Sequence, residues 1–308
     1  MGINSMSDSI TVLAAINRGY VQHLGVMLCS LFENNSQHRI CAHVLCDVWD
    51  EPGRSRLDRL AQRHQQKIDF ISVDRTRFER FPISLHLDAS TYFRILCPKF
   101  LPASIDRVLY LDSDIVVRKD LGELWASDSR GAAVAAVADS PNILRERGKA
   151  LGLVPGCDYF NAGVLLIDLA KWREAVIAER LVSFVEANRA TLPYMDQDAL
   201  NAVLARDWHA LDPRWNRQEY HFNDSAIAPA DLIRETAILH FTGRSKPWDY
   251  MNTHPGKREY LKYLALTEWR DFTPPDRSPG NFLRKHGLMP EFVQNFINQR
   301  HDRRNGAV

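Results

Sequence analysis

Apolar and polar residues follow two different periods in the first part of the chain. Residues 10–16 (ITVLAAI), 40–46 (ICAHVLC) and 68–73 form short apolar runs, which are typical of buried β-strands. Residues 20–34 carry apolar side chains at helical spacing, and residues 51–66 do so among many arginines. The alternating order of strands and helices predicts a parallel, doubly wound α/β sheet. We expect the arginines of residues 51–66 to form a solvated helix face, with a docking patch as the alternative.

The same two patterns recur through the rest of the chain. A helix is predicted at residues 90–96 with Ser90 as its N-cap, and a longer helix at residues 175–189. Residues 159–168 begin with a polar turn and continue as an apolar strand, in which Gly163 allows a close approach of backbone. Further elements are predicted as strands at residues 132–138 and 236–241, and as a helix that begins at Tyr194.

The apolar run from Arg107 to Leu111 ends in two carboxylates, Asp112 and Asp114, one residue apart. Side chains at positions i and i+2 of a strand point the same way, so we expect both carboxylates to project together at the strand end. They repel each other unless a cation or a proton intervenes, and hard oxygen ligands suit Mg²⁺ or Mn²⁺. Because open α/β sheets bind ligands at the carboxyl ends of their strands, the expected partner of such a metal is a nucleotide diphosphate. A solvated turn or a helix cap is the alternative.

Three consecutive polar residues, Asp196, Gln197 and Asp198, open the helix that begins at Tyr194. An N-terminal helix turn favours acidic residues because of the helix dipole. That interpretation accounts for the two aspartates but leaves the glutamine unexplained. The three side chains are therefore candidates for a polar site.

The late strand at residues 236–241 ends at His240, and Gly243 and Lys246 follow closely. A strand-end histidine, a flexible glycine and a lysine would supply a metal ligand, a backbone donor and an ammonium around a diphosphate. A packed core histidine is the alternative.

Composition places the chain among ordinary globular proteins. It has 308 residues, of which 45% are hydrophobic and 25% charged, enough for one large domain or two ordinary ones. A formal net charge of +1 gives no whole-chain case for nucleic-acid binding. The 5 cysteines are scattered without a CxxC pair, which argues against a structural zinc site or a disulfide framework and favours a reducing compartment.

The two ends of the sequence bear on its location. The N-terminus lacks a basic region, and residues 10–16 are too short for a signal core or a membrane span. We therefore expect a cytoplasmic protein, or one bound peripherally to the inner face of the cytoplasmic membrane. Prolines and a glycine after residue 272 predict a linker, and residues 290–304 predict a basic amphipathic helix. That helix either docks on the body of the protein or lies on an anionic membrane surface.

Four segments, in order, resemble the bacterial family 8 glycosyltransferases, above all the lipopolysaccharide glucosyl- and galactosyltransferases. They are STYFR at residues 90–94, VLYLDSDIVV at 108–117, FNAGVLLID at 160–168 with DQD at 196–198, and HFTGRSKPW at 240–248. The resemblance covers roughly residues 10–265 and agrees in both order and spacing. It implies a GT-A fold, which is α/β with a mixed, mostly parallel central sheet. We place this single domain at residues 8–270 and a C-terminal helical tail at residues 271–308.

The resemblance also implies a UDP-hexose donor, carrying glucose or galactose, and a lipooligosaccharide or lipopolysaccharide acceptor. Its metal would be Mn²⁺, with Mg²⁺ as the alternative, held by Asp112, Asp114 and His240; an imidazole beside two carboxylates suits Mn²⁺ better. Matching positions assign nucleotide and diphosphate binding to Ala14, Ala15, Asn17, Asp112, Ser113, Gly243 and Lys246. They assign the hexose pocket to Arg94, Asp139, Asn161, Asp196 and Gln197.

Family members retain the anomeric configuration, and this chemistry would centre on Asp196 and Gln197. As the anomeric C–O bond breaks, the metal and Lys246 would stabilise charge on the departing phosphate oxygen. Two routes stay open. One of the two side chains attacks the sugar carbon, as in retaining glycosidases, or the acceptor attacks from the leaving-group face with the departing phosphate as base.

One position departs from the family. Ile16 stands where an Ala-Ala-Asp-Asp-Asn-like turn has an aspartate, and Asn17 would then supply the base-reading amide from a position displaced by one residue.

Two other functions compete with transfer. A non-catalytic nucleotide-sugar-binding protein is one, and Ile16 favours it. A phosphatase or phosphotransferase with Asp112 as nucleophile is the other. In that class the Asp-x-Asp motif usually lies on the first strand, whereas here it follows a later one. Such a function would also leave residues 240–248 without a role.

Overall fold

The computed structural model describes residues 9–78, 89–153, 158–189, 192–223 and 226–288. All structural statements below refer to those residues. The predicted amphipathic helix at residues 290–304 lies outside them.

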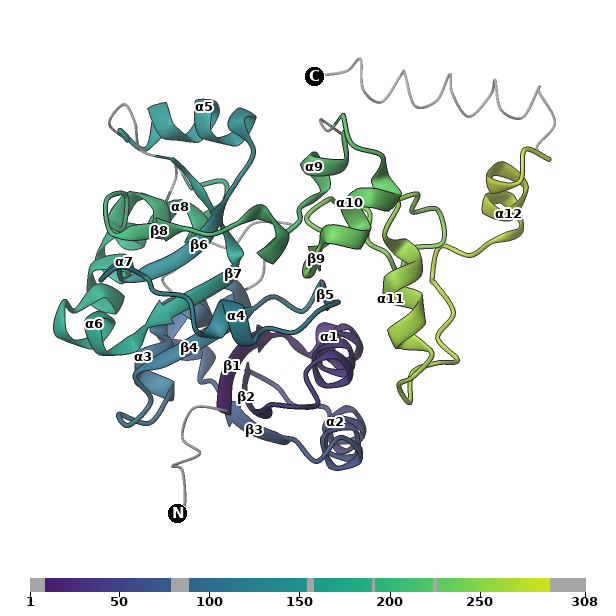
Figure 1. Ribbon diagram of the computed structural model, residues 1–308, viewed down its shortest axis with the longest axis horizontal. Coiled ribbons are helices and arrows are strands. Elements are labelled where there is room, and N and C mark those ends of the chain that lie inside the picture. Colours follow the sequence, from purple (N-terminus) through teal and green to yellow (C-terminus); the bar gives the residue numbers. More distant parts are fainter. Residues whose placement is uncertain (1–8, 79–88, 154–157, 190–191, 224–225, 289–308) are drawn as a thin grey trace.

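The first part of the chain folds as its hydrophobic pattern predicts. Strands β1 (Ser9–Ile16), β2 (Arg39–Cys46) and β3 (Lys67–Ser72) alternate with helices α1 (Val21–Asn34) and α2 (Glu51–Arg63) (Figure 1). A 3-10 turn, η1 (Arg18–Tyr20), precedes α1, and Asn17 caps it by accepting a hydrogen bond from Gly19 N. Helix α2 begins at its cap Asp50 and ends at Arg63, earlier than predicted, because Gln65 adopts a left-handed φ of 55°.

The central sheet has seven strands in the order β3-β2-β1-β4-β7-β6-β8. Its other members are β4 (Arg107–Leu111), β6 (Val134–Ala138), β7 (Phe160–Asp168) and β8 (Trp208–Ala210). Strand β7 runs antiparallel to both β4 and β6, whereas the other neighbouring pairs are parallel. The prediction of a mixed, mostly parallel sheet is confirmed. Residues 160 and 161 belong to β7, so the polar turn predicted there is part of the strand.

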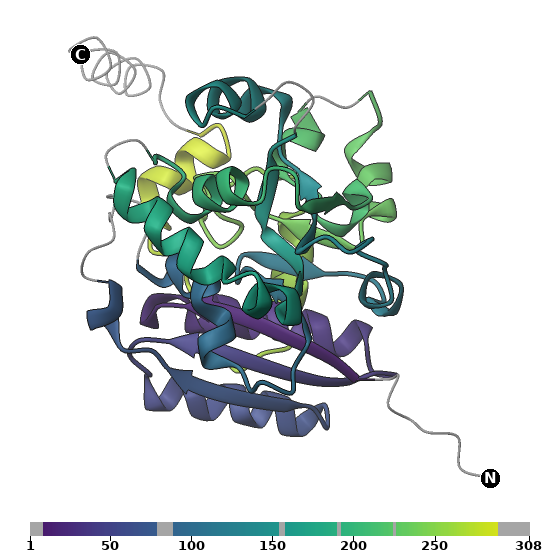
Figure 2. The ribbon, with the colours of Figure 1, turned by 90° about the vertical axis from the view of Figure 1, so that its left-hand side faces the viewer.

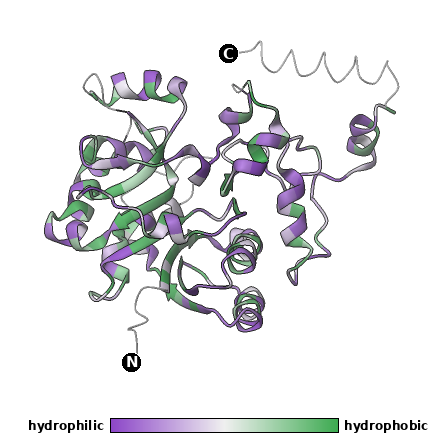
Figure 3. Ribbon diagram, in the orientation of Figure 1, coloured by the Kyte–Doolittle hydropathy of each residue, from purple (hydrophilic) through white to green (hydrophobic). Residues whose placement is uncertain are grey.

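Both faces of the sheet are buried, as parallel strands require. In β1, Ile10, Val12 and Ala14 pack against α1 and α2, while Leu13 and Ala15 point into the opposite core. Apolar residues concentrate along the strands and on the inner helix faces (Figure 3).

A second helical layer covers that opposite face (Figure 2). It contains the 3-10 segment η3 (Ala89–Leu96) and helices α3 (Cys97–Phe100), α6 (Leu169–Glu174), α7 (Ile177–Ala187) and α8 (Met195–Val203). The single helix predicted at residues 175–189 is wrong in extent, because Val176 has a φ of 45° and separates α6 from α7. The helix predicted at residues 90–96 is a 3-10 segment.

A small second sheet lies beside the end of β4. Strands β5 (Ile115–Val117) and β9 (Ile238–His240) pair antiparallel, with Ile115 opposite His240. The Asp-x-Asp motif is the turn between β4 and β5. Pairing of β5 with β9 therefore brings the histidine predicted at a strand end next to the two carboxylates.

The remaining elements are short. They are η2 (Arg75–Phe78), α4 (Gly122–Trp125), α5 (Pro141–Ala150), η4 (Pro213–Trp215), α9 (Glu219–Asn223), α10 (Pro229–Glu235), α11 (Lys257–Leu264) and α12 (Pro279–Lys285). Helix α12 occupies part of the predicted linker, and its cap is Ser278. Among the helices described, none combines the length and the apolar character that a membrane span needs.

The arginines of α2 lie on a solvent-accessible face of the helix, as predicted, and they also contact the chain that follows α11. Arg59 makes a bidentate ion pair with Glu268, at 2.7 Å for both contacts. Arg63 donates to the Leu266 carbonyl at 2.8 Å, and the Arg56 guanidinium lies 5.4 Å from the ring centre of Trp269. The alternative of a docking patch stays a prediction.

Candidate active site

Two cavities meet at the carboxyl end of β4. The larger, about 490 Å³, extends past Asp139, Asn161 and Gln197, and the smaller, about 240 Å³, extends past Asn17 and Tyr20. The walls that both cavities share consist of Thr91, Arg94, Asp112, Asp114 and Lys246. A ligand of two parts could therefore place one part in each cavity and a charged linkage between them.

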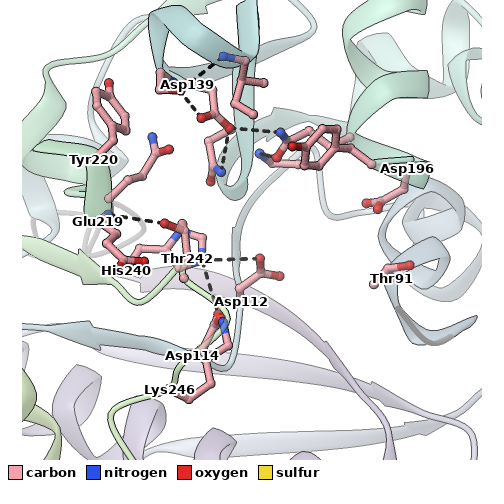
Figure 4. A pocket seen from close by; sticks show the side chains of 18 of the residues that line it. Thr91, Asp112, Asp114, Asp139, Asp196, Glu219, Tyr220, His240, Thr242 and Lys246 are labelled. Carbon is pink, nitrogen blue, oxygen red and sulfur yellow. Dashed lines mark hydrogen bonds and ion pairs between the residues drawn. The ribbon is translucent and has the colours of Figure 1, made fainter. Parts of the chain in front are cut away.

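The predicted metal ligands converge at this junction. His240 Nε2 lies 3.3 Å from Asp114 Oδ1 and 3.8 Å from Asp112 Oδ2. One ligand atom from each of the three side chains lies within 4.8 Å of the others. Ligand atoms about 2.1 Å from a metal and at right angles to one another lie about 3 Å apart, so this triad fits a small divalent cation. Figure 4 shows Asp112, Asp114 and His240 facing the same space.

Backbone hydrogen bonds fix the turn that carries the two aspartates. Asp112 N donates to the Gly163 carbonyl of β7 at 2.9 Å, and Phe241 N donates to the Asp114 carbonyl at 3.1 Å. The motif is thus clamped between the central sheet and the small sheet. Its two carboxylates point together because of this clamped turn, not because of the strand alternation that the sequence predicts.

Gly163 supplies the space for the predicted metal ligands. A Cβ atom at this position would overlap the His240 ring and lie 2.8 Å from Asp112 Oδ2. The close backbone approach predicted for this glycine is confirmed. Gly243, also predicted at the site, lies against Glu219 so closely that a Cβ there would overlap its carboxylate.

A chain of amides supports the histidine from behind. His240 Nδ1 lies 2.9 Å from Asn216 Oδ1, and Asn216 Nδ2 donates to Asn161 Oδ1 at 2.9 Å. Asn161 in turn donates to Asp139 Oδ2 at 3.2 Å. Asn216 follows η4 and has no sequence signal of period or motif, so sequence reasoning missed it.

Lys246 lies beside the Asp-x-Asp motif. Its Nζ donates to Asp114 Oδ2 at 2.8 Å and to the Phe241 carbonyl at 2.6 Å. Burial raises the pKa of Asp114, but Lys246 and His240 outweigh it and hold that pKa below the ordinary value. The carboxylate is therefore ionised and available to a cation.

Arg94 is a buried cation between two carboxylates. It lies 2.7 Å from Asp196 Oδ2 through Nε and 3.1 Å from Asp112 Oδ1 through Nη2, and it donates to the Ala162 carbonyl at 2.5 Å. Burial raises the pKa of Asp196 to about 6, although Arg94 opposes this shift. Tyr110 also donates to Asp112 Oδ1, at 2.7 Å.

Gln197 is held in one orientation at the wall of the larger cavity. Its Nε2 donates to Asp139 Oδ2 and its Oε1 accepts from Ala162 N, each at 3.0 Å. Asp198 instead points into the protein. It forms a buried bidentate pair with Arg147 at 2.9 and 3.0 Å and accepts from Tyr159 Oη at 2.9 Å. Gln197 and Asp198 therefore have different roles, since of these two residues only Gln197 lines the cavity.

The smaller cavity contains the turn predicted to bind the nucleoside. Ala15, Asn17 and Ser113 line it, and Tyr20 lines it as well. Ile16 also lines it, although this residue is only 1% exposed and otherwise belongs to the core beneath the cavity. Ala14, 1% exposed, is a core residue of β1 and does not line either cavity.

Several lining residues were not predicted from the sequence. They include Thr91, Tyr20, Ser140, Tyr194, Glu219 and Tyr220. Thr91 belongs to STYFR and Tyr194 lies two residues before DQD, so these motifs are the sequence signal that could have indicated both residues. Glu219 and Tyr220 enter through α9, which the hydrophobic pattern does not indicate. Figure 4 shows them opposite Asp196 and Thr91 across the cavity.

Known proteins share this chain's sequence and fold. The family model "Glycosyl transferase family 8" matches residues 11–252. General stress protein A of Bacillus subtilis is 33% identical over 276 residues, which cover 86% of this chain and 96% of that protein. Lipopolysaccharide 1,2-glucosyltransferase of Escherichia coli is 26% identical over 281 residues, which cover 88% of this chain and 82% of its own. The crystal structure of galactosyltransferase LgtC with donor and acceptor sugar analogues has a TM-score of 0.76 at 28% identity, covering 87% of this chain and 98% of that one.

Proposed function

The chain belongs to glycosyl transferase family 8 and has its GT-A fold, and from this premise we propose that it transfers a hexose from a UDP-hexose to a glycan. Glucose and galactose are the candidate hexoses, because relatives carry both activities in their names. The acceptor we propose is a lipopolysaccharide-type oligosaccharide. The domain boundary near residue 270, the cytoplasmic location and the peripheral membrane contact stay predictions from the sequence.

The observation that carries the proposal is the junction of the two cavities. A nucleotide-sugar has a nucleoside, a diphosphate and a hexose in that order. The smaller cavity, with Ala15, Asn17 and Tyr20, suits the nucleoside, and the larger one suits the hexose and an acceptor. The diphosphate would then lie at the shared wall, beside Asp112 and Asp114.

Asp112, Asp114 and His240 would hold Mn²⁺, with Mg²⁺ as the alternative. When bound, the metal would act as a Lewis acid that neutralises charge on the departing diphosphate. Lys246 would add a second positive charge, since its ammonium lies at the same wall and is desolvated there. Ser113, which lines the smaller cavity, and Gly243, which lines the larger one, would contact the diphosphate through their backbone.

Arg94, Asp139, Asn161, Asp196 and Gln197 would form the hexose pocket. Their mutual hydrogen bonds fix each polar group before a sugar arrives, which lowers the cost of orienting the donor. We propose retention of the anomeric configuration. Gln197, whose amide is pinned at both ends, would face the sugar carbon as the glycosyl-phosphate bond breaks. Attack by a side chain at position 196 or 197 and same-face attack by the acceptor both remain compatible with this arrangement.

Family membership argues against the phosphatase or phosphotransferase alternative. Phosphatase chemistry at Asp112 is not proposed further, since His240 and Lys246 complete a transferase-type site around that residue. The non-catalytic nucleotide-sugar binder is the second candidate, and Ile16 is the observation that favours it. It predicts UDP binding without turnover.

The experiment that separates these functions measures UDP release from a panel of UDP-sugars without acceptor. We expect slow hydrolysis of one hexose donor in Mn²⁺, and loss of that activity with chelator. Binding of UDP with no turnover of any sugar, even after glycan acceptors are added, would favour the binding protein. Preferential binding of another nucleotide would contradict the UDP assignment and implicate Ile16.

Asp114→Ala tests the metal site directly. We expect at least a hundredfold loss of UDP release, because the variant removes a metal ligand and the partner of Lys246. The far-UV circular dichroism spectrum should stay unchanged. Asp271→Ala is the matched control, since Asp271 is exposed and lines neither cavity. Full activity of the Asp114 variant would overturn the metal assignment.

A further inference from the structure

Asn216 connects the metal-binding histidine to the hexose pocket. Its side chain is fully buried, at 0% exposure, and lies behind the cavity wall without lining it. It is bonded on one side to His240 Nδ1 and on the other to Asn161 Oδ1, each at 2.9 Å. A buried amide with partners on both sides can take only one orientation if each partner is itself fixed.

The orientation of Asn161 is fixed twice. Asp139 already accepts hydrogen bonds from Ser140 N and from the Gln197 amide, and the group of Asn161 that faces it at 3.2 Å is the NH₂. The Gly163 backbone N–H can only donate, and it lies 3.0 Å from the other end of the amide, which must therefore be the carbonyl oxygen. The reversed amide would set acceptor against acceptor and donor against donor.

The fixed orientation of Asn161 determines the orientation of the next amide in the chain, Asn216. Because Asn161 presents its oxygen to Asn216, Asn216 must present its NH₂ to Asn161 and its own oxygen to His240. An amide oxygen only accepts, so His240 Nδ1 must carry a proton. We propose that Asn216 is a positioning residue that sets the ring orientation and tautomer of His240, and thereby the affinity of the site for its divalent metal.

The consequence lies at the other ring nitrogen. With the proton fixed on Nδ1, Nε2 is the ring nitrogen left to bind a metal, and it faces Asp114 and Asp112 at 3.3 and 3.8 Å. Metal-binding histidines depend on such a partner at the second nitrogen for their orientation and basicity. This inference rests on the metal role in the proposed function, but it concerns a residue that touches neither metal nor donor.

The Asp139 carboxylate lies at the start of this chain of amides and also accepts a hydrogen bond from Gln197. Asp139 Oδ2 accepts from Asn161 at 3.2 Å and from Gln197 at 3.0 Å, and its Oδ1 accepts from Ser140 N at 2.6 Å. The hexose wall and the amide chain behind His240 therefore share Asp139 as an acceptor. Without this acceptor, only the Gly163 N–H would orient Asn161.

Mn²⁺ binding to the donor-free protein tests the proposal. Titration followed by the electron paramagnetic resonance signal of free Mn²⁺ gives the dissociation constant without any turnover. We expect Asn216→Ala to raise that constant ten- to a hundredfold. Turnover of the variant should recover at saturating Mn²⁺, since the catalytic groups remain in place.

The matched control is Asn35→Ala. Asn35 is also a fully buried asparagine, at 0% exposure, bonded to Leu31 and Leu121, and it lines neither cavity. A general loss of stability would weaken metal binding in both variants, whereas the proposal confines the effect to Asn216. Equal Mn²⁺ affinities of wild type and Asn216→Ala would overturn it, even if wild type transfers sugar and Asp114→Ala does not.

The tautomer itself can be read by nitrogen-15 NMR of the His240 ring in metal-free protein. We expect Nδ1 to be protonated in the wild type, whether or not Nε2 is. In Asp139→Asn, which keeps the side-chain size, we expect a second ring state and weaker Mn²⁺ binding. A wild-type ring with an unprotonated Nδ1 would overturn the proposal. That result would leave the transferase assignment untouched, because UDP release is measured separately.

Discussion

At the scale of single residues, burial sets the protonation of a histidine packed behind the smaller cavity. His23 contacts Tyr20, which lines that cavity, and stacks on Trp248 with 3.5 Å between ring centroids. Its Nδ1 lies 2.8 Å from the Tyr260 hydroxyl. Burial lowers the pKa of His23 from 6.5 to about 4, so the imidazole is neutral at physiological pH and packs as an aromatic ring.

This shift predicts acid sensitivity of the fold. Below pH 6.5 the unfolded chain takes up a proton at His23 that the folded chain refuses until about pH 4, so stability falls as pH drops through that window. Between pH 7 and pH 5 the loss from this group is about 2 kcal/mol. Urea unfolding at both pH values should show a pH dependence smaller by about that amount in His23→Gln than in wild type.

The comparison between the two proteins isolates His23 from other groups. Asp196 acts in the opposite direction, because its raised pKa of about 6 makes the folded protein bind a proton before the unfolded one. His254, whose pKa burial lowers to about 4, acts like His23. Both contributions are common to wild type and variant. The same pH dependence in both proteins would mean that His23 is protonated freely in the fold.

At the scale of elements, the site depends on a turn between two sheets. Strand β4 of the central sheet ends at Leu111, and β5 of the small sheet begins at Ile115. The chain between them therefore passes from one sheet to the other. Strand β7 passes behind this turn and must approach it closely. Gly163 makes that approach possible, because it is the point at which β7 faces both His240 and Asp112.

We therefore expect Gly163→Ala to disable the metal site. The added methyl group would displace the His240 ring and the Asp112 carboxylate, and Mn²⁺ affinity should fall at least tenfold. Titration of Mn²⁺ against the donor-free protein measures this change. Gly280→Ala is the control, since its Cβ would come no closer than 4.0 Å to Ser278 Oγ. Wild-type affinity in the Gly163 variant would show that the ring and carboxylate move aside at no cost.

At the scale of the whole molecule, helix α11 and the chain directly after it pack against the first helices of the fold. Helix α11 buries Tyr260, Tyr263 and Leu264, at 1%, 2% and 5% exposure, in the core of α1 and α2. The chain after it packs Trp269 against Gly25, where a Cβ would come within 2.5 Å of the indole. The first and last parts of the domain therefore form one core.

Shortened chains test this single domain. A chain ending at Gly256 loses three large buried side chains, which together contribute about 5–9 kcal/mol, comparable to the whole stability of a domain. We expect it not to fold, as judged by the loss of a cooperative urea transition. A chain ending at Thr273 keeps that core and should unfold cooperatively and bind UDP. Cooperative folding of the shorter chain would place the domain boundary before α11.

The sequence by itself determined the main elements of the first part of this protein and the residue types of its candidate site. Apolar runs and helical spacing located β1 to β3 and their helices, because burial on both faces of a parallel sheet demands such runs. Motif order assigned Asp112, Asp114, His240 and Lys246 to one site. Those side chains belong to short segments whose residue types report their chemistry directly.

Only the tertiary structure decided how these segments meet. Pairing of β5 with β9 spans more than a hundred residues, and no local pattern encodes it. The amide chain through Asn216, the inward turn of Asp198 toward Arg147 and the docking of α2 arginines on residues 266–269 are likewise contacts between distant segments. Periodicity reports which side of an element is buried, but the partner on that side is fixed by packing of the whole chain.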